Sequence, residues 1–130
     1  MSESTGLSRG FAQGRPALVT YLMAGYPDRA TSLQALREAA HSGADIIELG
    51  VPYGDALADG PVIARAAKTA MNANPGGFGL SEAIDLAAEF LADPGADEAP
   101  PLALMTYYNP ILKMGAVSYT HLTLPTTPYV

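Results

Sequence analysis

The chain has 130 residues, which is enough for one globular domain of ordinary size. Asp and Glu outnumber Lys and Arg by 13 to 7, so the formal charge is −6 and the backbone of a nucleic acid would be repelled. Because the chain has no Cys and only two His, a disulfide framework and a thiolate metal site are excluded, and we expect no metal centre.

Neither a targeting segment nor a membrane span is apparent. Residues 1–15 lack the apolar core of a signal peptide, and no run approaches the roughly 18 apolar residues that cross a bilayer. We therefore expect a cytoplasmic protein that binds neither nucleic acid nor membrane.

A strand, a helix and a second strand are predicted in the first part of the chain. Residues 17–22 form a short apolar run with β-branched and aromatic side chains, which favours a strand. Residues 29–42 carry apolar side chains at helical spacing and directly follow Asp28, which is a good N-cap residue. They predict a helix. Residues 45–51 are too few for a buried helix and predict the second strand.

Two helices and a third strand follow. A helix is predicted from Pro61 to residue 71, a second one, capped by Ser81, to about Leu91, and a strand over residues 102–106. We expect the buried faces to comprise Val62, Ile63, Ala66, Ala67, Ala70 and Met71 in the first helix and Ile84, Ala87, Ala88 and Leu91 in the second. Apolar strands that alternate with helices predict the α/β class with a parallel sheet.

Glu48 is the strongest candidate for catalysis. Parallel strands are usually buried on both faces, so a carboxylate in the strand 45–51 is expected inside, where burial favours the protonated form. A group in that state can serve as a general acid and base, and it stands near the carboxyl end of its strand, where α/β proteins place active sites. The alternative is a structural Glu that pairs with an Arg or Lys.

Two further carboxylates lie in the loop that follows. Asp55 and Asp59 stand among glycines and prolines in the segment 51–61, and a buried acid followed by a loop carboxylate suits proton-transfer chemistry. The alternatives are an Asx-turn for Asp55 and helix capping for Asp59.

The segment Gly43–Pro61, GADIIELGVPYGDALADGP, closely resembles the signature of the tryptophan synthase alpha subunit family. Val19–Pro27 (VTYLMAGYP) and Leu104–Gly115 (LMTYYNPILKMG) resemble the same family in the same order, so that the resemblance covers residues from about 5 to about 117. It implies a (β/α)8 TIM barrel that cleaves indole-3-glycerol phosphate to indole and glyceraldehyde 3-phosphate, a carbon–carbon lyase of tryptophan biosynthesis.

The resemblance also implies roles for single residues. Glu48 would be the general acid and base at the indole carbon that is released, and Asp59 would accept a hydrogen bond from the indole N–H. Tyr21 and Tyr107 would line the indole pocket, with core aromatics as the alternative. Another phosphate-handling (β/α)8 lyase or isomerase is a further possibility, but its motif would not reproduce the segment 48–61.

A partner is implied in the same way. The family assembles as an alpha2beta2 heterotetramer with the tryptophan synthase beta subunit, which depends on pyridoxal phosphate, whereas no cofactor is implied for this chain. The loop with Asp55 and the loop near Asn109 to Leu112 would contact the beta subunit.

Several features indicate an incomplete barrel. A full barrel takes roughly 250 residues, and residues 1–117 supply its first three strands with their helices, without the later units that hold the family's phosphate site. Residues 118–130 have no charged side chain, four Thr and two Pro, and are predicted to be a non-native tail that is not helical. We expect Ile46, Ile47 and Leu104 to lack packing partners. The alternative to an enzyme is an inert chain that retains only the loops that bind the beta subunit.

Overall fold

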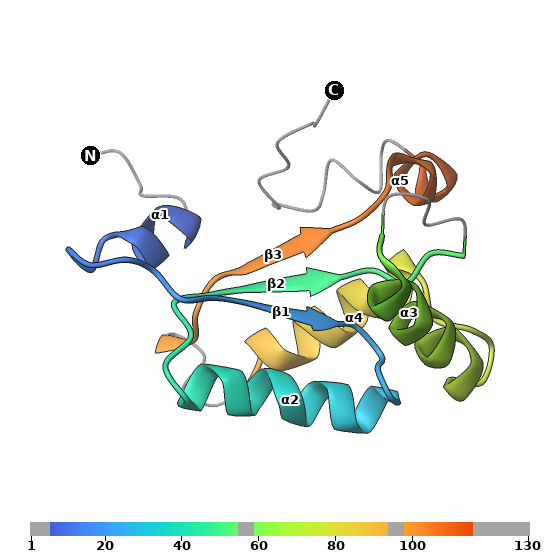
Figure 1. Cartoon of the computed structure of the whole chain (residues 1–130), viewed down its shortest axis with the longest axis horizontal. Coiled ribbons are helices and arrows are strands. Elements are labelled where there is room, and N and C mark those ends of the chain that lie inside the picture. The colour runs from blue at the N-terminus through green and yellow to red at the C-terminus, as the bar shows by residue number, and fades with distance from the viewer. Residues whose placement is uncertain (1–5, 55–58, 94–97, 116–130) are drawn as a thin grey trace.

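Three parallel strands form the central sheet of the computed structural model, which describes residues 6–54, 59–93 and 98–115 (Figure 1). β1 (Val19–Met23), β2 (Ile46–Gly50) and β3 (Leu102–Met105) lie in the order β1-β2-β3. The helices are α1 (Gly6–Phe11), α2 (Arg29–His41), α3 (Pro61–Ala73), α4 (Leu80–Leu91) and α5 (Tyr108–Met114). Parallel neighbours require a crossover, and helices supply it between both pairs of strands. The predicted α/β class is confirmed.

The helix caps follow the sequence in one case and depart from it in another. α2 begins behind Asp28 as predicted, and this carboxylate accepts a hydrogen bond from the Thr31 backbone N–H at 2.8 Å. The N-cap of α4 is Gly79, and the prediction of Ser81 as the cap is wrong. The Glu82 side chain accepts a hydrogen bond from the Gly79 N–H at 2.9 Å, so the helix starts one residue before Ser81.

α2 and α4 cover one face of the sheet and enclose the main core (Figure 1). The core side chains of this cluster come from β2, β3, α2, α4 and the segments next to them: Ala24, Leu33, Leu36, Ile47, Leu49, Val51, Phe78, Leu80, Ala83, Leu86, Phe90 and Leu102. Two ion pairs join the same helices at the surface, Arg29 to Glu89 and Arg37 to Asp93, each at 2.7 Å.

Two of the predicted helix faces need correction. Leu91 of α4 is 49% exposed and Ala88 is also exposed, whereas Leu86 and Phe90 are buried. The predicted face was rotated by one residue, because Leu and Phe bury more apolar area than the alanines and determine which side of the helix packs inward. Val62 is 74% exposed, because it lies in the first turn of α3, before the part that packs.

α1 packs at the amino-terminal end of the sheet, where no helix was predicted. Its buried Gly10 lies so close to Ile46 that a Cβ atom built there would be 2.9 Å from the Ile46 Cδ1. Ile46 and Ile47 are both buried, so the expectation that they lack partners is wrong: α1 covers the first and the main core contains the second. Leu104 is partly buried against the same core.

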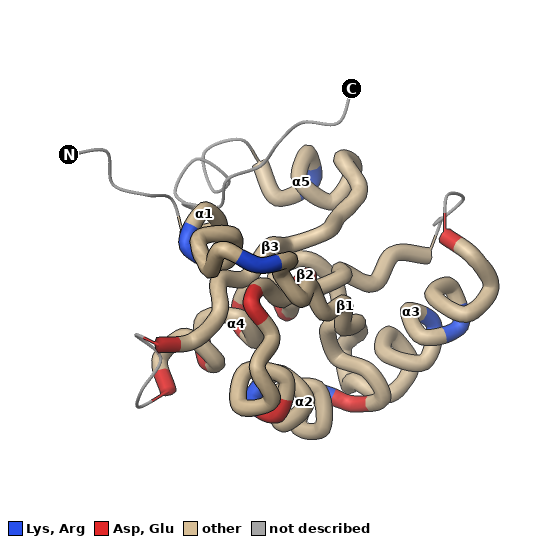
Figure 2. The backbone as a smooth tube through the Cα atoms, turned by 60° about the vertical axis from the view of Figure 1, so that its left-hand side comes forward, with Lys and Arg blue, Asp and Glu red and all other residues tan. Residues whose placement is uncertain are grey.

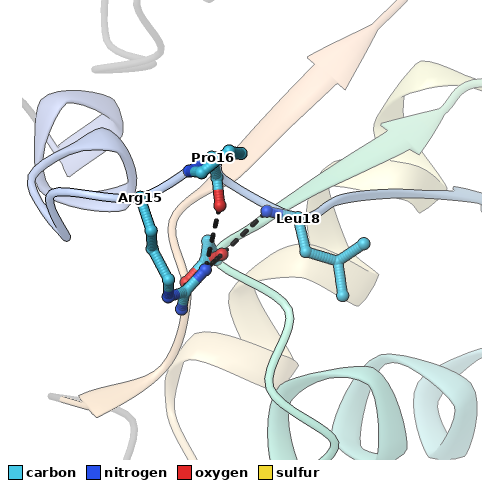
Figure 3. Close-up of polar contacts among 4 residues, drawn as sticks. Arg15, Pro16 and Leu18 are labelled. Carbon is cyan, nitrogen blue, oxygen red and sulfur yellow. Dashed lines mark hydrogen bonds and ion pairs between the residues drawn. The ribbon is translucent and has the colours of Figure 1, made fainter.

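A bidentate ion pair fixes the approach to β1. The Asp45 carboxylate, only 8% exposed, accepts hydrogen bonds from both terminal nitrogens of Arg15 at 2.9 Å and from the Leu18 N–H at 2.7 Å. Figure 3 shows how Arg15 and Leu18 converge on this group, while Arg15 also donates to the Pro16 carbonyl. These bonds lower the pKa of Asp45, those with Arg15 most. The contacts attach residues 15–18 to the start of β2.

Charged residues lie mainly on the helices and connections (Figure 2), and Glu48 is the single charged residue of the three strands. In the described part of the chain β1 and β3 each pair on one side only. Residues 118–130, predicted to be a non-helical tail, lie outside the described residues.

Candidate active site

Tyr21 and Glu48 lie opposite each other near the carboxyl ends of β1 and β2. They are register partners in the parallel pairing, and Glu48 in turn pairs with Ala103 of β3. Directly paired residues of parallel strands project their side chains from the same face of the sheet. The two predicted site residues therefore share the face opposite α2 and α4.

The Tyr21 side chain extends over Gly50, the last residue of β2. A Cβ atom built at Gly50 would lie 2.6 Å from the Tyr21 Cζ and 3.0 Å from its Cε2, so a larger residue would displace the ring. The phenol thus points along the sheet toward its carboxyl edge, where the loop with Asp59 follows β2.

The surroundings of Tyr21 bring the other predicted site residues together. Burial raises the pKa of the Tyr21 phenol, and the nearby charges of Asp59 and Glu48, together with Tyr107, raise this pKa further. A negative charge disfavours a second one close by, which accounts for the direction of this shift. We therefore treat Glu48, Asp59, Tyr21 and Tyr107, which come from four separate segments, as one candidate site.

Glu48 is half-buried, which corrects the expectation of a carboxylate fully inside the protein. On the face that carries it, α1 covers the amino end of β2 and α3 packs on Met23 of β1, whereas α2 and α4 cover the opposite face. No Arg or Lys among the residues that the structure describes forms an ion pair with Glu48. The alternative of a structural Glu with a cationic partner therefore has no support in this part of the chain.

Asp59 stands directly before α3 without capping it. The N-cap is Gly60, Pro61 occupies the first turn, and the cap has no side-chain hydrogen bond. The helix-capping alternative for Asp59 is therefore wrong. α3 lies beyond the carboxyl ends of the strands (Figure 1), where Ala67 and Ala70 pack on Met23 of β1. This packing brings the amino end of α3, and Asp59 with it, to the site. Asp55 lies outside the described residues.

Tyr107, at the end of β3, packs against Tyr53 with 5.1 Å between the ring centroids. Its hydroxyl is buried and has no hydrogen-bond partner in the described ranges. The Asn109 side chain donates a hydrogen bond to the Tyr53 hydroxyl at 3.2 Å, and the segment near Asn109 to Leu112, predicted as a loop, belongs to α5. Tyr53 was not identified as a candidate, although the motif 43–61 contains it.

A cavity of about 450 Å³ adjoins these residues between the end of β2 and α3. Its walls are Tyr53, Gly54, Ala64, Lys68 and Met71, and neither Glu48 nor Asp59 lines it. In the parts of the chain that the structure describes, no three His, Asp or Glu side chains gather as a group that could hold a metal ion.

Comparison with known proteins identifies the family. The family model for the tryptophan synthase alpha chain matches residues 7–123. This chain belongs to the tryptophan synthase alpha chain family. Among solved structures, tryptophan synthase from M. tuberculosis is 37% identical with a TM-score of 0.71 over 87% of this chain. Tryptophan synthase subunit alpha from Legionella pneumophila str. Paris is 30% identical, with a TM-score of 0.72 over 85%. A protein from Aquifex aeolicus VF5 is 33% identical, with a TM-score of 0.76 over 95%.

The alpha-chain fold shown by these relatives accounts for the sheet. This chain covers 42%, 40% and 50% of those three chains, respectively, and so spans about half of their length or less. Its three strands and their helices match part of a TIM barrel, as predicted. The family match ends at residue 123, so the boundary proposed at residues 117 and 118 stays a prediction. None of the described helices is long and apolar enough to cross a membrane.

Proposed function

We propose that the full-length protein to which this chain corresponds is a carbon–carbon lyase. It cleaves indole-3-glycerol phosphate to indole and glyceraldehyde 3-phosphate, in tryptophan biosynthesis. The single observation that carries the proposal is the pairing of Glu48 with Tyr21 near the carboxyl ends of β1 and β2, where the loop with Asp59 follows. Membership of the tryptophan synthase alpha chain family supports the choice of substrate.

In this proposal the two carboxylates have different tasks. Glu48 adds a proton to the indole carbon that bears the glycerol phosphate side chain. The carbon–carbon bond then breaks with its electron pair left on the indole, and the side-chain hydroxyl becomes the aldehyde as it returns a proton to the Glu48 carboxylate. Asp59 accepts a hydrogen bond from the indole N–H, which stabilises positive charge on the ring during the step. No Arg or Lys in the described residues forms an ion pair with the Glu48 carboxylate, so the proposed step would not have to break one.

The aromatic residues form the walls of the proposed pocket. Tyr21, held over Gly50, contacts one side of the indole, and Tyr107 contacts the other, with Tyr53 behind it. The buried Tyr107 hydroxyl has no partner in the described ranges, so a polar group of the ligand would satisfy it.

We also propose that the tryptophan synthase beta subunit, itself dependent on pyridoxal phosphate, is the partner. Asp55 and Asn109 would lie in the contact, in a cytoplasmic alpha2beta2 heterotetramer. Asn109 donates a hydrogen bond to Tyr53, which packs on Tyr107, so the proposed contact is linked to the proposed pocket through two residues.

The test is a full-length protein in which residues 1–117 are joined to the remaining barrel of a family member. Glu48→Gln keeps the shape of the side chain and removes its titration, and we expect indole release to fall about 100- to 10,000-fold. Glu38→Gln, the same change on the exposed face of α2, is the matched control and should retain activity. A fall of less than tenfold for Glu48→Gln refutes the assignment. Asp59→Asn should impair cleavage and leave the fold intact.

The second candidate concerns the 130-residue chain by itself. Its β1 and β3 edges have no further strand in the described residues, and Met105 and Val19 on these strands are exposed. We propose that it is inactive and at most binds the beta subunit through Asn109 and its neighbours. Indole release by this chain alone, or a cooperative thermal transition of a monomer, would contradict the proposal.

A further inference from the structure

Asn74, directly after the last residue of α3, joins three segments through one amide. Its Nδ2 donates hydrogen bonds to the Gly25 carbonyl at 3.1 Å and to the Ala70 carbonyl, and its Oδ1 accepts one from the Arg29 N–H at 3.1 Å. The end of α3 is thereby tied to the turn after β1 and to the first residue of α2. We call these contacts the Asn74 clamp.

The turn that receives the clamp is itself firmly held. Gly25 has a φ of +78°, and a Cβ atom built there would lie 2.8 Å from the ring of Phe78. The Ser32 hydroxyl accepts a hydrogen bond from the Gly25 N–H at 3.0 Å inside the protein. The clamp therefore attaches α3 to a part of the molecule that has little freedom to move.

The remaining contacts of α3 leave its position along β1 weakly determined. Ala67 and Ala70 pack on Met23, with Tyr21, Ile63 and Ala66 partly buried against them, and apolar packing of this kind is not directional. The hydrogen bonds of Asn74 are directional, so they fix the position of α3 along β1, which the apolar packing alone leaves loose. Because a 13-residue helix moves as a unit about 20 Å long, a shift at Asn74 is carried to the residues before its amino end.

From this geometry we propose that Asn74 is a positioning residue that holds Asp59 beside Tyr21 and Glu48. Asp59 directly precedes the N-cap Gly60, so the pose of α3 sets where its carboxylate lies. The catalytic part of this inference rests on the proposed function, whereas the structural part concerns only the clamp. Asn72, exposed near the same end of α3, offers a control of the same residue type.

The structural part is tested by amide hydrogen exchange, measured by NMR on the full-length protein defined above. Asn74→Ala should speed exchange at the Arg29 amide at least about fivefold, as expected for the loss of one hydrogen bond, and Asn72→Ala should not change it. Asn74→Asp keeps the acceptor for Arg29 and loses the donor to Gly25, so it should retain protection at Arg29. Unchanged exchange at Arg29 in Asn74→Ala overturns the clamp.

The catalytic part is tested by a double-mutant cycle with Asp59→Asn. In the presence of Asp59, Asn74→Ala should lower kcat for indole release about five- to tenfold, and Asn72→Ala should not. In the Asp59→Asn background, Asn74→Ala should change kcat less than twofold, because the group that it positions is already gone. Equal losses in both backgrounds overturn the inference. If the unmodified protein releases no indole, the proposed function fails, while the exchange data still decide the clamp.

Discussion

Gly50→Ala would test whether the Tyr21 ring lies where the structure places it. The added methyl group would lie 2.6 Å from the Tyr21 Cζ, well inside the roughly 3.5 Å at which heavy atoms pack without overlap. The backbone at Gly50 does not have a positive φ, so alanine causes no backbone strain and the whole penalty comes from the ring. Overpacking of this kind costs about 1–3 kcal/mol, offset in part by the lower entropy of the unfolded chain.

We expect the free energy of unfolding of the full-length protein, measured in urea, to fall by about 1–2 kcal/mol in Gly50→Ala. Because the ring must move by a large part of an ångström within the site, kcat/KM for indole release should fall about tenfold or more. Gly54→Ala is the matched control, since a Cβ atom there meets no described atom within 4 Å. In the double variant Gly50→Ala/Tyr21→Ala, the free energy of unfolding should recover, because the overlap with the ring is gone, whereas kcat/KM should stay low. Normal stability and activity of Gly50→Ala would show that the ring does not cover Gly50.

Two further predictions concern parts of the chain away from the site. Asp45→Asn should destabilise the full-length protein at pH 7, whereas Asp85→Asn, on the exposed side of α4, should not. Because the pKa of Asp45 is lowered in the folded state, its contribution is present above the ordinary value of 3.8 and is lost as the pH falls through the folded pKa. The difference in stability between the two proteins should therefore shrink as the pH falls below 3.8. Residues 118–130 are predicted to be foreign to the protein, and a regular helix across 118–130 that packs beside β3 would contradict this prediction.

Much of the fold could be predicted because local signals and long-range packing agree. β2 is apolar, short and followed by Pro52, and the strand occurs where these features indicate. α1 and α5 were missed because helices of six and seven residues are too short to display a helical repeat. The inward face of α4 was misassigned because several rotations bury alanines equally well, and only packing on the sheet selects the one with Leu86 and Phe90 inside.

Candidate site residues could be proposed from the sequence, but their contacts could not. A carboxylate in an apolar strand makes Glu48 a candidate, but its half-exposure depends on which face the helices cover. The capping alternative for Asp59 could not be decided beforehand, because the neighbouring Gly60 is also an acceptable N-cap, although a weaker one than Asp. The contact of Tyr53 with Tyr107 joins residues far apart in the chain, so no local sequence pattern predicts it.

The packing of α1 gives the two ends of β2 different access to solvent. Gly10 of α1 lies against Ile46 of β2. Glu48 follows two residues later in the strand, on the same face. A side chain at Gly10 would push the helix away, since a Cβ atom there would also lie 2.8 Å from the Asp45 carbonyl oxygen. Along this face the strand therefore changes from Ile46, 3% exposed under α1, to the half-buried Glu48 nearer the carboxyl end. Solvent thus reaches the face from its carboxyl side, where the loops are.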